Sequence, residues 1–96
     1  MFFIISAMDK PGASGLRQET REAHLTYVRE TDRVRMGGPY LDEAGNMIGS
    51  MLVLEAADLA AAERWAENDP YAKAGVFQSS VVTPWKMTVN NCGAGL

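Results

Sequence analysis

Four stretches of the chain are rich in hydrophobic residues at strand spacing. Phe2 to Met8 is apolar on both alternating faces, which is typical of a strand that is covered on both sides. The other predicted strands are Val34 to Leu41, Met47 to Glu55 and Val76 to Met87. Pro39 interrupts the second of these, and because proline has no amide hydrogen to donate, it indicates a sheet edge or a bulge.

Two other stretches predict helices. From Leu16 to Glu30, residues three and four apart form the inner stripe of an amphipathic helix: Leu16, Thr20, Ala23, Tyr27 and Val28. His24 lies on or beside that stripe, away from the charged face. A second helix is expected from Leu59 to about Glu67, with Asp58 as its N-cap. Asn68-Asp69-Pro70 ends it, because the residue before a proline avoids the helical conformation.

The resulting order, βαββαβ, predicts an α+β fold of the ferredoxin-like kind. In it, one antiparallel sheet carries both helices on one face. A chain of 96 residues is expected to form a single domain, residues 1–96, in which 87–96 are a loose C-terminal tail. A core of this size is thin. Since the helices cover only one side of the sheet, we expect a homodimer that pairs through the uncovered sheet face.

Charge and composition exclude several classes of partner. The net charge is −3, and five arginines between positions 17 and 35 are interleaved with acidic residues, so we interpret them as a solvated, mixed-charge face. This set is Arg17, Arg21, Arg29, Arg33 and Arg35. Without a basic stripe, no nucleic-acid partner is expected. The apolar N-terminal stretch is too short to span a bilayer and lacks a basic start, so no membrane partner is expected and the default location is cytoplasmic.

No metal or cofactor is expected. Cys92 is the only cysteine, which excludes an intramolecular disulfide, and it is interpreted as a bystander thiol in the tail. One histidine and one distant cysteine give no metal ligand set, although His24 with Asp69 could hold an adventitious ion. Gly12-Ala13-Ser14-Gly15 lacks the Lys-Ser/Thr pair of a phosphate-binding loop.

The candidate chemistry centres on the only histidine, His24. Imidazole has an ordinary pKa near neutrality, which suits a general acid or base. The alternative is a histidine at the edge of the core that bonds a backbone carbonyl. Asp69 either caps a turn or accepts one imidazole N–H and so fixes the tautomer. In this topology the first helix and the exit of the second share a sheet face, so the two side chains can meet.

Four further residues are candidates for substrate binding: Gly38, Pro39, Ser50 and Tyr71. Ser50 either holds a substrate oxygen or is small because the sheet packs closely there, and no Gly-x-Ser-x-Gly elbow marks it as a nucleophile. Gly38 and Pro39 either open a gap towards backbone groups or form a β-bulge. Tyr71 follows the Asp-Pro turn. Trp85 is interpreted as a core or dimer contact.

The order of several short motifs resembles the YciI-like (YCII-related) family from Met1 to about Lys86. The motifs are Phe3-Ile4-Ile5, Asp9-Lys10-Pro11, Arg21-x-x-His24-Leu25, Gly38-Pro39, Gly49-Ser50, Asp69-Pro70-Tyr71, Ala74-Gly75-Val76 and Pro84-Trp85-Lys86. The resemblance implies ferredoxin-like subunits that pair sheet to sheet into a dimeric α+β barrel. It also implies a pocket around a His–Asp pair, carried here by His24 and Asp69.

The resemblance implies cofactor-free chemistry, since dehydrochlorination is an activity among such relatives and muconolactone isomerase shares the fold class. The leading hypothesis is a lyase or isomerase that moves a proton on a small organic acid or lactone. The alternative is a non-catalytic dimeric protein that binds a small ligand, or acts as an accessory protein, through the same pocket. A monooxygenase of the same barrel class is a third possibility.

Overall fold

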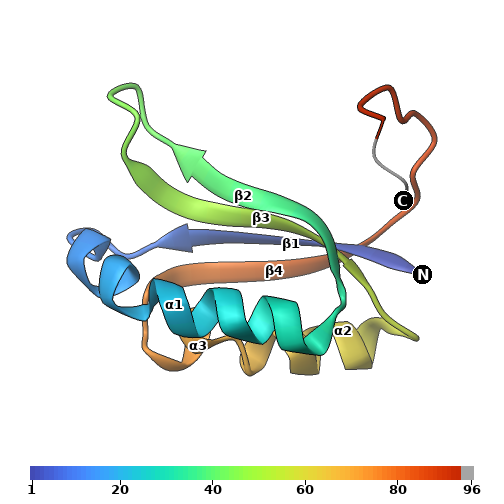
Figure 1. The fold of residues 1–96 in the computed structure, drawn as a ribbon, viewed down its shortest axis with the longest axis horizontal. Coiled ribbons are helices and arrows are strands. Elements are labelled where there is room, and N and C mark those ends of the chain that lie inside the picture. Colours follow the sequence, from blue (N-terminus) through green and yellow to red (C-terminus); the bar gives the residue numbers. More distant parts are fainter. Residues whose placement is uncertain (94–96) are drawn as a thin grey trace.

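The computed structural model describes residues 1–93 as one sheet covered by helices on one side (Figure 1). The elements are β1 (Phe2–Asp9), α1 (Ser14–Thr31), β2 (Val34–Leu41), β3 (Met47–Glu55), α2 (Leu59–Glu67), α3 (Pro70–Lys73) and β4 (Phe77–Trp85). The strands pair antiparallel in the order β2-β3-β1-β4. The predicted α+β, ferredoxin-like arrangement is confirmed.

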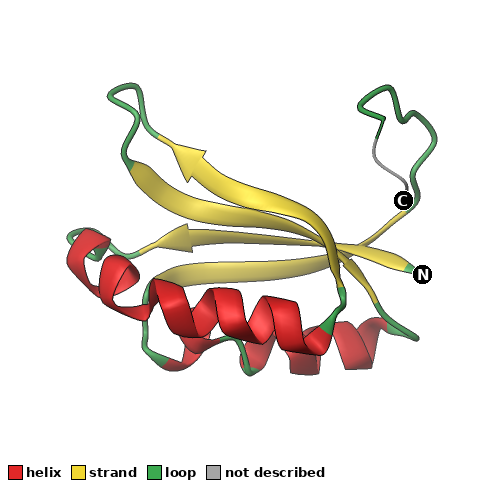
Figure 2. Cartoon of the chain, viewed as in Figure 1, coloured by secondary structure: helices red, strands yellow, loops and turns green. Residues whose placement is uncertain are grey.

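The core lies between the sheet and the helices, which Figure 2 shows on a single side of the strands. Phe3 and Ile5 of β1 point into this layer and are buried. They pack with Leu54 of β3 and with Ala62 and Trp65 of α2. Ala62 and Trp65 are the buried residues of α2.

The inner face of α1 differs from the prediction by about one residue. Its buried residues are Arg17 and His24, whereas Leu16 is 37% exposed and Ala23 is exposed. The predicted stripe was wrong at Leu16 and Ala23 because hydrophobic spacing cannot recognise a buried arginine. Tyr27 and Val28 do pack against the core.

β2 is an edge strand, as the proline indicated. The interpretation of Gly38-Pro39 as a bulge is wrong, because Gly37 to Tyr40 pair in continuous register with β3. The irregularities fall instead between Val34 and Met36 and between Tyr40 and Leu41. Since an edge strand has one unpaired side, Pro39 can stay in the ladder without a lost hydrogen bond.

The bounds of the elements after β3 are close to those predicted. The Asp58 carboxylate accepts the Ala61 N–H at 2.8 Å and caps α2. A four-residue helix, α3, stands where a short turn was expected, and β4 is shorter than expected at each end. Of the predicted tail, residues 87–93 have no helix or strand, and 94–96 lie outside the described residues.

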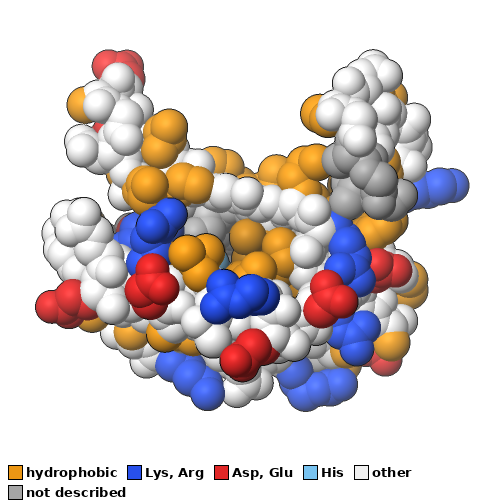
Figure 3. All heavy atoms as spheres, viewed as in Figure 1, with side chains coloured by type: hydrophobic (Ala, Val, Ile, Leu, Met, Phe, Trp, Pro, Cys, Tyr) orange, Lys and Arg blue, Asp and Glu red, His pale blue; other side chains and the backbone are white. Residues whose placement is uncertain are grey.

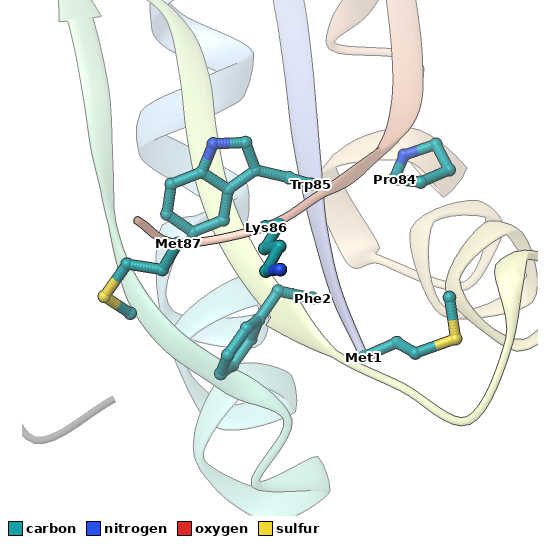
Figure 4. A pocket seen from close by; sticks show the side chains of 6 residues that line it. All are labelled: Met1, Phe2, Pro84, Trp85, Lys86 and Met87. Carbon is teal, nitrogen blue, oxygen red and sulfur yellow. The ribbon is translucent and has the colours of Figure 1, made fainter. Parts of the chain in front are cut away.

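The sheet face away from the helices carries exposed hydrophobic side chains. By register, Ser6, Val81 and Met51 share this face, and Val81 is 59% exposed. At its end, the Phe2 and Trp85 rings meet edge to face, with centroids 6.4 Å apart, beside a hollow of about 630 Å³ (Figure 4). In Figure 3, charged side chains gather over the helices, and hydrophobic ones lie in the hollow between the β2–β3 hairpin and the C-terminal segment.

None of the helices among residues 1–93 is long and apolar enough to cross a membrane. A cytoplasmic location and the pairing of two copies stay predictions.

Candidate functional site

A cavity of about 290 Å³ opens between α1 and the β2 side of the sheet. α1 contributes Arg17, Arg21 and His24, and β2 contributes the Gly37-Gly38-Pro39 segment. Ser50 comes from β3 and Tyr71 from α3. The cavity thus gathers side chains from four elements, and five of the six predicted site residues line it: His24, Gly38, Pro39, Ser50 and Tyr71.

The sixth, Asp69, lies behind His24. His24 Nδ1 and Asp69 Oδ1 are 2.7 Å apart, and the two side chains are only 9% and 5% exposed. Asp69 is also the N-cap of α3, where the same Oδ1 accepts the Tyr71 N–H at 3.0 Å. The carboxylate is therefore fixed by local backbone structure before it meets the imidazole. The alternative interpretation of His24, a bond to a backbone carbonyl, does not apply.

The second imidazole nitrogen, Nε2, faces the cavity. A carboxylate only accepts hydrogen bonds, so Nδ1 carries the hydrogen in the His24–Asp69 bond. Nε2 bonds no described residue, yet every fully buried side-chain nitrogen or oxygen in residues 1–93 has a partner. Nε2 therefore reaches the open space that His24 lines. It is the ring nitrogen that has no hydrogen-bond partner among residues 1–93.

Tyr71 orients the imidazole from one side. The two rings stack with centroids 4.1 Å apart and planes 16° from parallel. Burial raises the pKa of Tyr71 from its ordinary value of 10.0, and the positive charges of Arg17 and Arg21 oppose that rise only in part. Tyr71 is thus a neutral phenol at neutral pH, which favours a positioning role over ionised chemistry.

Arg17 is a site residue that the sequence interpretation missed. Its guanidinium donates two hydrogen bonds to the Asp9 carboxylate, from Nε to Oδ2 at 2.7 Å and from Nη2 to Oδ1 at 3.1 Å. Nη2 also donates to Ser50 Oγ at 2.7 Å, and the guanidinium lies 4.6 Å from the centre of the Tyr71 ring. Burial, the largest single influence, lowers the pKa of Arg17, but the interactions with Asp9 and Tyr71 together raise it, so the net shift is upwards.

The assignment of Arg17 to a solvated face is therefore wrong. The missed signal was its spacing: Arg17 precedes His24 by seven residues, which is about two helical turns and places both on one face. Arg21 and Arg35, also assigned to that face, contribute to the lining of the cavity as well.

The space around the backbone differs between Gly38, a predicted site residue, and the neighbouring glycines Gly37 and Gly49. A Cβ at Gly38 would meet nothing within 4 Å, whereas one at Gly37 would push aside the end of the Leu52 side chain and lie in tight contact with the Met51 carbonyl oxygen. Likewise a Cβ at Gly49 would collide with the Ala7 carbonyl oxygen. Close sheet packing thus explains Gly49 and not Ser50, whose hydroxyl has a polar partner.

Metal ligands are sparse. Within the described part of the chain, no three His, Cys, Asp or Glu side chains are grouped so that they could hold a metal ion. Cys92 is exposed and lies far along the chain from the residues that line the cavity.

A ferredoxin-like sheet with a buried histidine–carboxylate pair facing a small cavity defines the class of protein. The model of the YCII-related domain matches residues 1–86. The chain belongs to the YCII-related, YciI-like family, as its motifs indicated.

Relatives agree with this assignment over most of the chain. An uncharacterised protein of Haemophilus influenzae is 34% identical over 96 residues, covering 90% of this chain and 97% of the relative. Protein YciI of Escherichia coli is 34% identical over 95 residues with the same coverage. A solved structure, 5-chloro-2-hydroxyhydroquinone dehydrochlorinase of Burkholderia phenoliruptrix in complex with 2,5-dihydroxybenzoquinone, matches with a TM-score of 0.84 and 35% identity. That match covers 90% of this chain and 94% of the other.

Proposed function

We propose that this protein is a cofactor-independent lyase or isomerase in which His24 transfers a proton on a small oxygenated organic acid, ring or lactone. The observation that carries the proposal is the buried His24–Asp69 pair, bonded at 2.7 Å, with Nε2 left free towards a cavity of about 290 Å³. The cavity is at the small end of the range for ligand sites, which suits a substrate of one ring.

Asp69 makes Nε2 a better base. It fixes the hydrogen on Nδ1, and it stabilises the imidazolium that forms when Nε2 takes a proton, as the orienting carboxylate does in a hydrolase triad. Stacking on Tyr71 limits rotation of the imidazole. General base catalysis by a positioned histidine contributes roughly 10²–10⁴-fold to a rate.

The dehydrochlorinase neighbour supports the reaction class. A dehydrochlorination removes one proton and one chloride ion: a base takes the proton, the electrons of its bond form a new π bond, and chloride leaves with the electrons of the carbon–chlorine bond. In this chain, His24 would be that base. We propose that its substrate shares the small, oxygen-rich ring of the neighbour's ligand.

The test uses the neighbour's two molecules as probes. Binding of 2,5-dihydroxybenzoquinone is followed by calorimetry, and chloride release from 5-chloro-2-hydroxyhydroquinone by an ion-selective electrode. A small set of lactones and carboxylates follows by thermal shift, since a bound ligand raises the melting temperature. We expect saturable binding, and turnover that His24→Asn reduces to background while circular dichroism stays unchanged.

Two results would decide against catalysis by His24. Turnover at the wild-type rate in His24→Asn removes the histidine from the mechanism. Saturable binding with no turnover of any probe favours the alternative, a dimeric ligand-binding or accessory protein that uses the same cavity.

We further propose that the functional unit is a homodimer, with one domain per chain, formed through the helix-free sheet face. The exposed hydrophobic side chains on that face support it, Val81 and Trp85 being 59% and 39% exposed. Sedimentation at micromolar concentration is expected to show twice the chain mass of 10.5 kDa. Val81→Glu should yield monomers, whereas Val89→Glu, at a more exposed position in the C-terminal segment, should not. A wild-type monomer contradicts the proposal.

A further inference from the structure

The hydroxyl of Ser50 has one defined partner. Arg17 Nη2 donates to Ser50 Oγ at 2.7 Å in a buried contact. A guanidinium has only donors, so Ser50 must accept in this bond. Asp9 accepts two further hydrogen bonds from the same guanidinium and so holds it in place. The direction from which Arg17 donates to Ser50 Oγ is therefore fixed.

The hydrogen of the Ser50 hydroxyl remains available. No residue among 1–93 accepts it, although Ser50 is only 5% exposed, and Ser50 lines the cavity. Because Arg17 is positive, it polarises the O–H bond and strengthens the hydroxyl as a donor. Ser50 is not placed as a nucleophile, since the hydrogen bond of His24 goes to Asp69 and no base contacts Ser50.

The charges around the cavity favour an anion. None of the described residues that line it is acidic, and Arg21 lines it without an ion pair to any described residue. Arg17 is neutralised by Asp9, at 2.7 Å, so its role is local. A ligand with a negative oxygen would therefore meet a donor at Ser50 and a positive charge at Arg21.

We propose that Ser50 Oγ–H binds an anionic oxygen of the ligand, a phenolate or enolate oxygen, and that Asp9 and Arg17 form a positioning pair that aims this donor. The inference rests on the proposed function and adds to it the class of substrate: an acidic enol or phenol whose oxygen is conjugated with the carbon that exchanges its proton at His24.

In this arrangement His24 and Ser50 act at the two ends of one conjugated system of the substrate. The step starts from the keto tautomer of the substrate. When Nε2 takes the proton from carbon, the electrons of the C–H bond form a carbon–carbon π bond, and the π electrons of the conjugated carbonyl move to its oxygen, which becomes the enolate or phenolate anion. Ser50 donates to that oxygen and keeps its own hydrogen. Donors fixed at the position where charge develops stabilise a transition state without reorganisation. The stack in which Tyr71 lies between Arg17 and His24 holds donor and base in one rigid frame.

The experiment measures binding and ionisation of 2,5-dihydroxybenzoquinone, an acidic hydroxyquinone whose absorption spectrum changes when it ionises. Bound to the wild-type protein, it should ionise at lower pH than in solution, because the site favours the anion. Ser50→Ala should weaken binding of the anion about tenfold or more, as for loss of a hydrogen bond to a charged group. It should also return the ionisation of the bound probe towards its value in solution.

Ser80→Ala is the matched control. Ser80 pairs with Ala7 from β4 as Ser50 does from β3, but it is exposed and does not line the cavity. We expect the Ser80→Ala variant to bind 2,5-dihydroxybenzoquinone with the wild-type affinity and to give the same spectrum of the bound probe. Ser50→Thr, which keeps the hydroxyl, should retain most of the spectral shift.

The positioning role is tested by a double-mutant cycle. Arg17→Lys keeps the charge and loses the planar fork, so it should weaken binding in the wild-type background and have little further effect beside Ser50→Ala. Equal effects in both backgrounds would overturn the role of Arg17. If Arg17→Lys does not fold, the Ser50 variants alone decide.

Failure of this inference is separable from failure of the proposed function. An unchanged affinity and spectrum in Ser50→Ala, with chloride release that still depends on His24, overturns the inference alone. A wild-type protein that neither binds the hydroxyquinone nor turns over any probe overturns both.

Discussion

The layer between sheet and helices has two halves of opposite character. Next to α2 it is apolar: Phe3 and Leu54 are fully buried and Ala62 and Trp65 cover them. Next to the first turns of α1 it is polar, with Arg17, His24, Ser50 and Asp69 all buried. Along β3 the core side chains change from Leu54 through Leu52 to Ser50.

The difference shows how a thin core can contain a cavity. In the apolar half, large side chains fill the space and supply burial energy. In the polar half, side chains become small on the sheet and charged on the helix, and space remains between them. The polar half is stable because every fully buried polar side-chain atom in residues 1–93 is hydrogen-bonded. The predictions below separate the contributions of the two halves.

The largest effect is expected at Asp69. Asp69→Asn keeps an oxygen for the Tyr71 N–H but removes the charge that orients and supports His24. Turnover should fall by roughly 10³–10⁴-fold, as for loss of the orienting carboxylate in a hydrolase triad. Asp58→Asn is the control, because Asp58 caps α2 and contacts no histidine. Steady-state kinetics with both variants decides: an equal, small effect would reduce Asp69 to a helix cap.

Leu54→Ala tests the apolar half. Leu54 is fully buried, so the cavity left behind should lower the free energy of unfolding by about 2–5 kcal/mol. Turnover per folded molecule should not change. Leu59→Ala on α2, where the side chain is 40% exposed, is the control. Urea denaturation measures both, and a loss below 1 kcal/mol for Leu54→Ala would show that this half is loosely packed.

High pH tests whether both halves exclude water. Burial raises the pKa of Tyr27, which contacts the apolar core, and that of Tyr71, in the polar half, from the ordinary value of 10.0. The folded state therefore keeps these protons after the unfolded chain releases them. The contribution of these two tyrosines to the free energy of unfolding is therefore complete below pH 10. It is lost as the pH rises through their pKa values in the folded state. Stability should fall above pH 10 and fall less in Tyr27→Phe/Tyr71→Phe. An equal fall in the double variant contradicts this.

The smallest effect is expected outside both halves. Cys92 is exposed in the segment after β4. Cys92→Ser should change the free energy of unfolding by less than about 0.5 kcal/mol, as for other surface substitutions, and leave turnover unchanged. A larger loss in thermal denaturation would show that the segment packs against another part of the protein.

Hydrophobic spacing predicted the order and approximate bounds of the elements because each strand and helix shows its own period. It also brought Asp69 near His24, since topology alone places both on the helix side of the sheet. It could not predict that Arg17 replaces Leu16 on the inner face of α1. A buried ion pair follows from Asp9, eight residues earlier across a turn, and no periodicity within the helix reveals that partner.

The two hydrogen bonds of Asp69 Oδ1 have a consequence for inferring activity across relatives. One bond caps α3, so Asp69 serves the fold whether or not it also serves a reaction. The imidazole of His24 caps no helix, and its hydrogen bond goes to the Asp69 side chain. Under the proposed mechanism, the histidine is therefore a more informative marker of activity among relatives than the aspartate. An aspartate kept beside a substituted histidine would identify a lineage that inherited the architecture and abandoned the reaction.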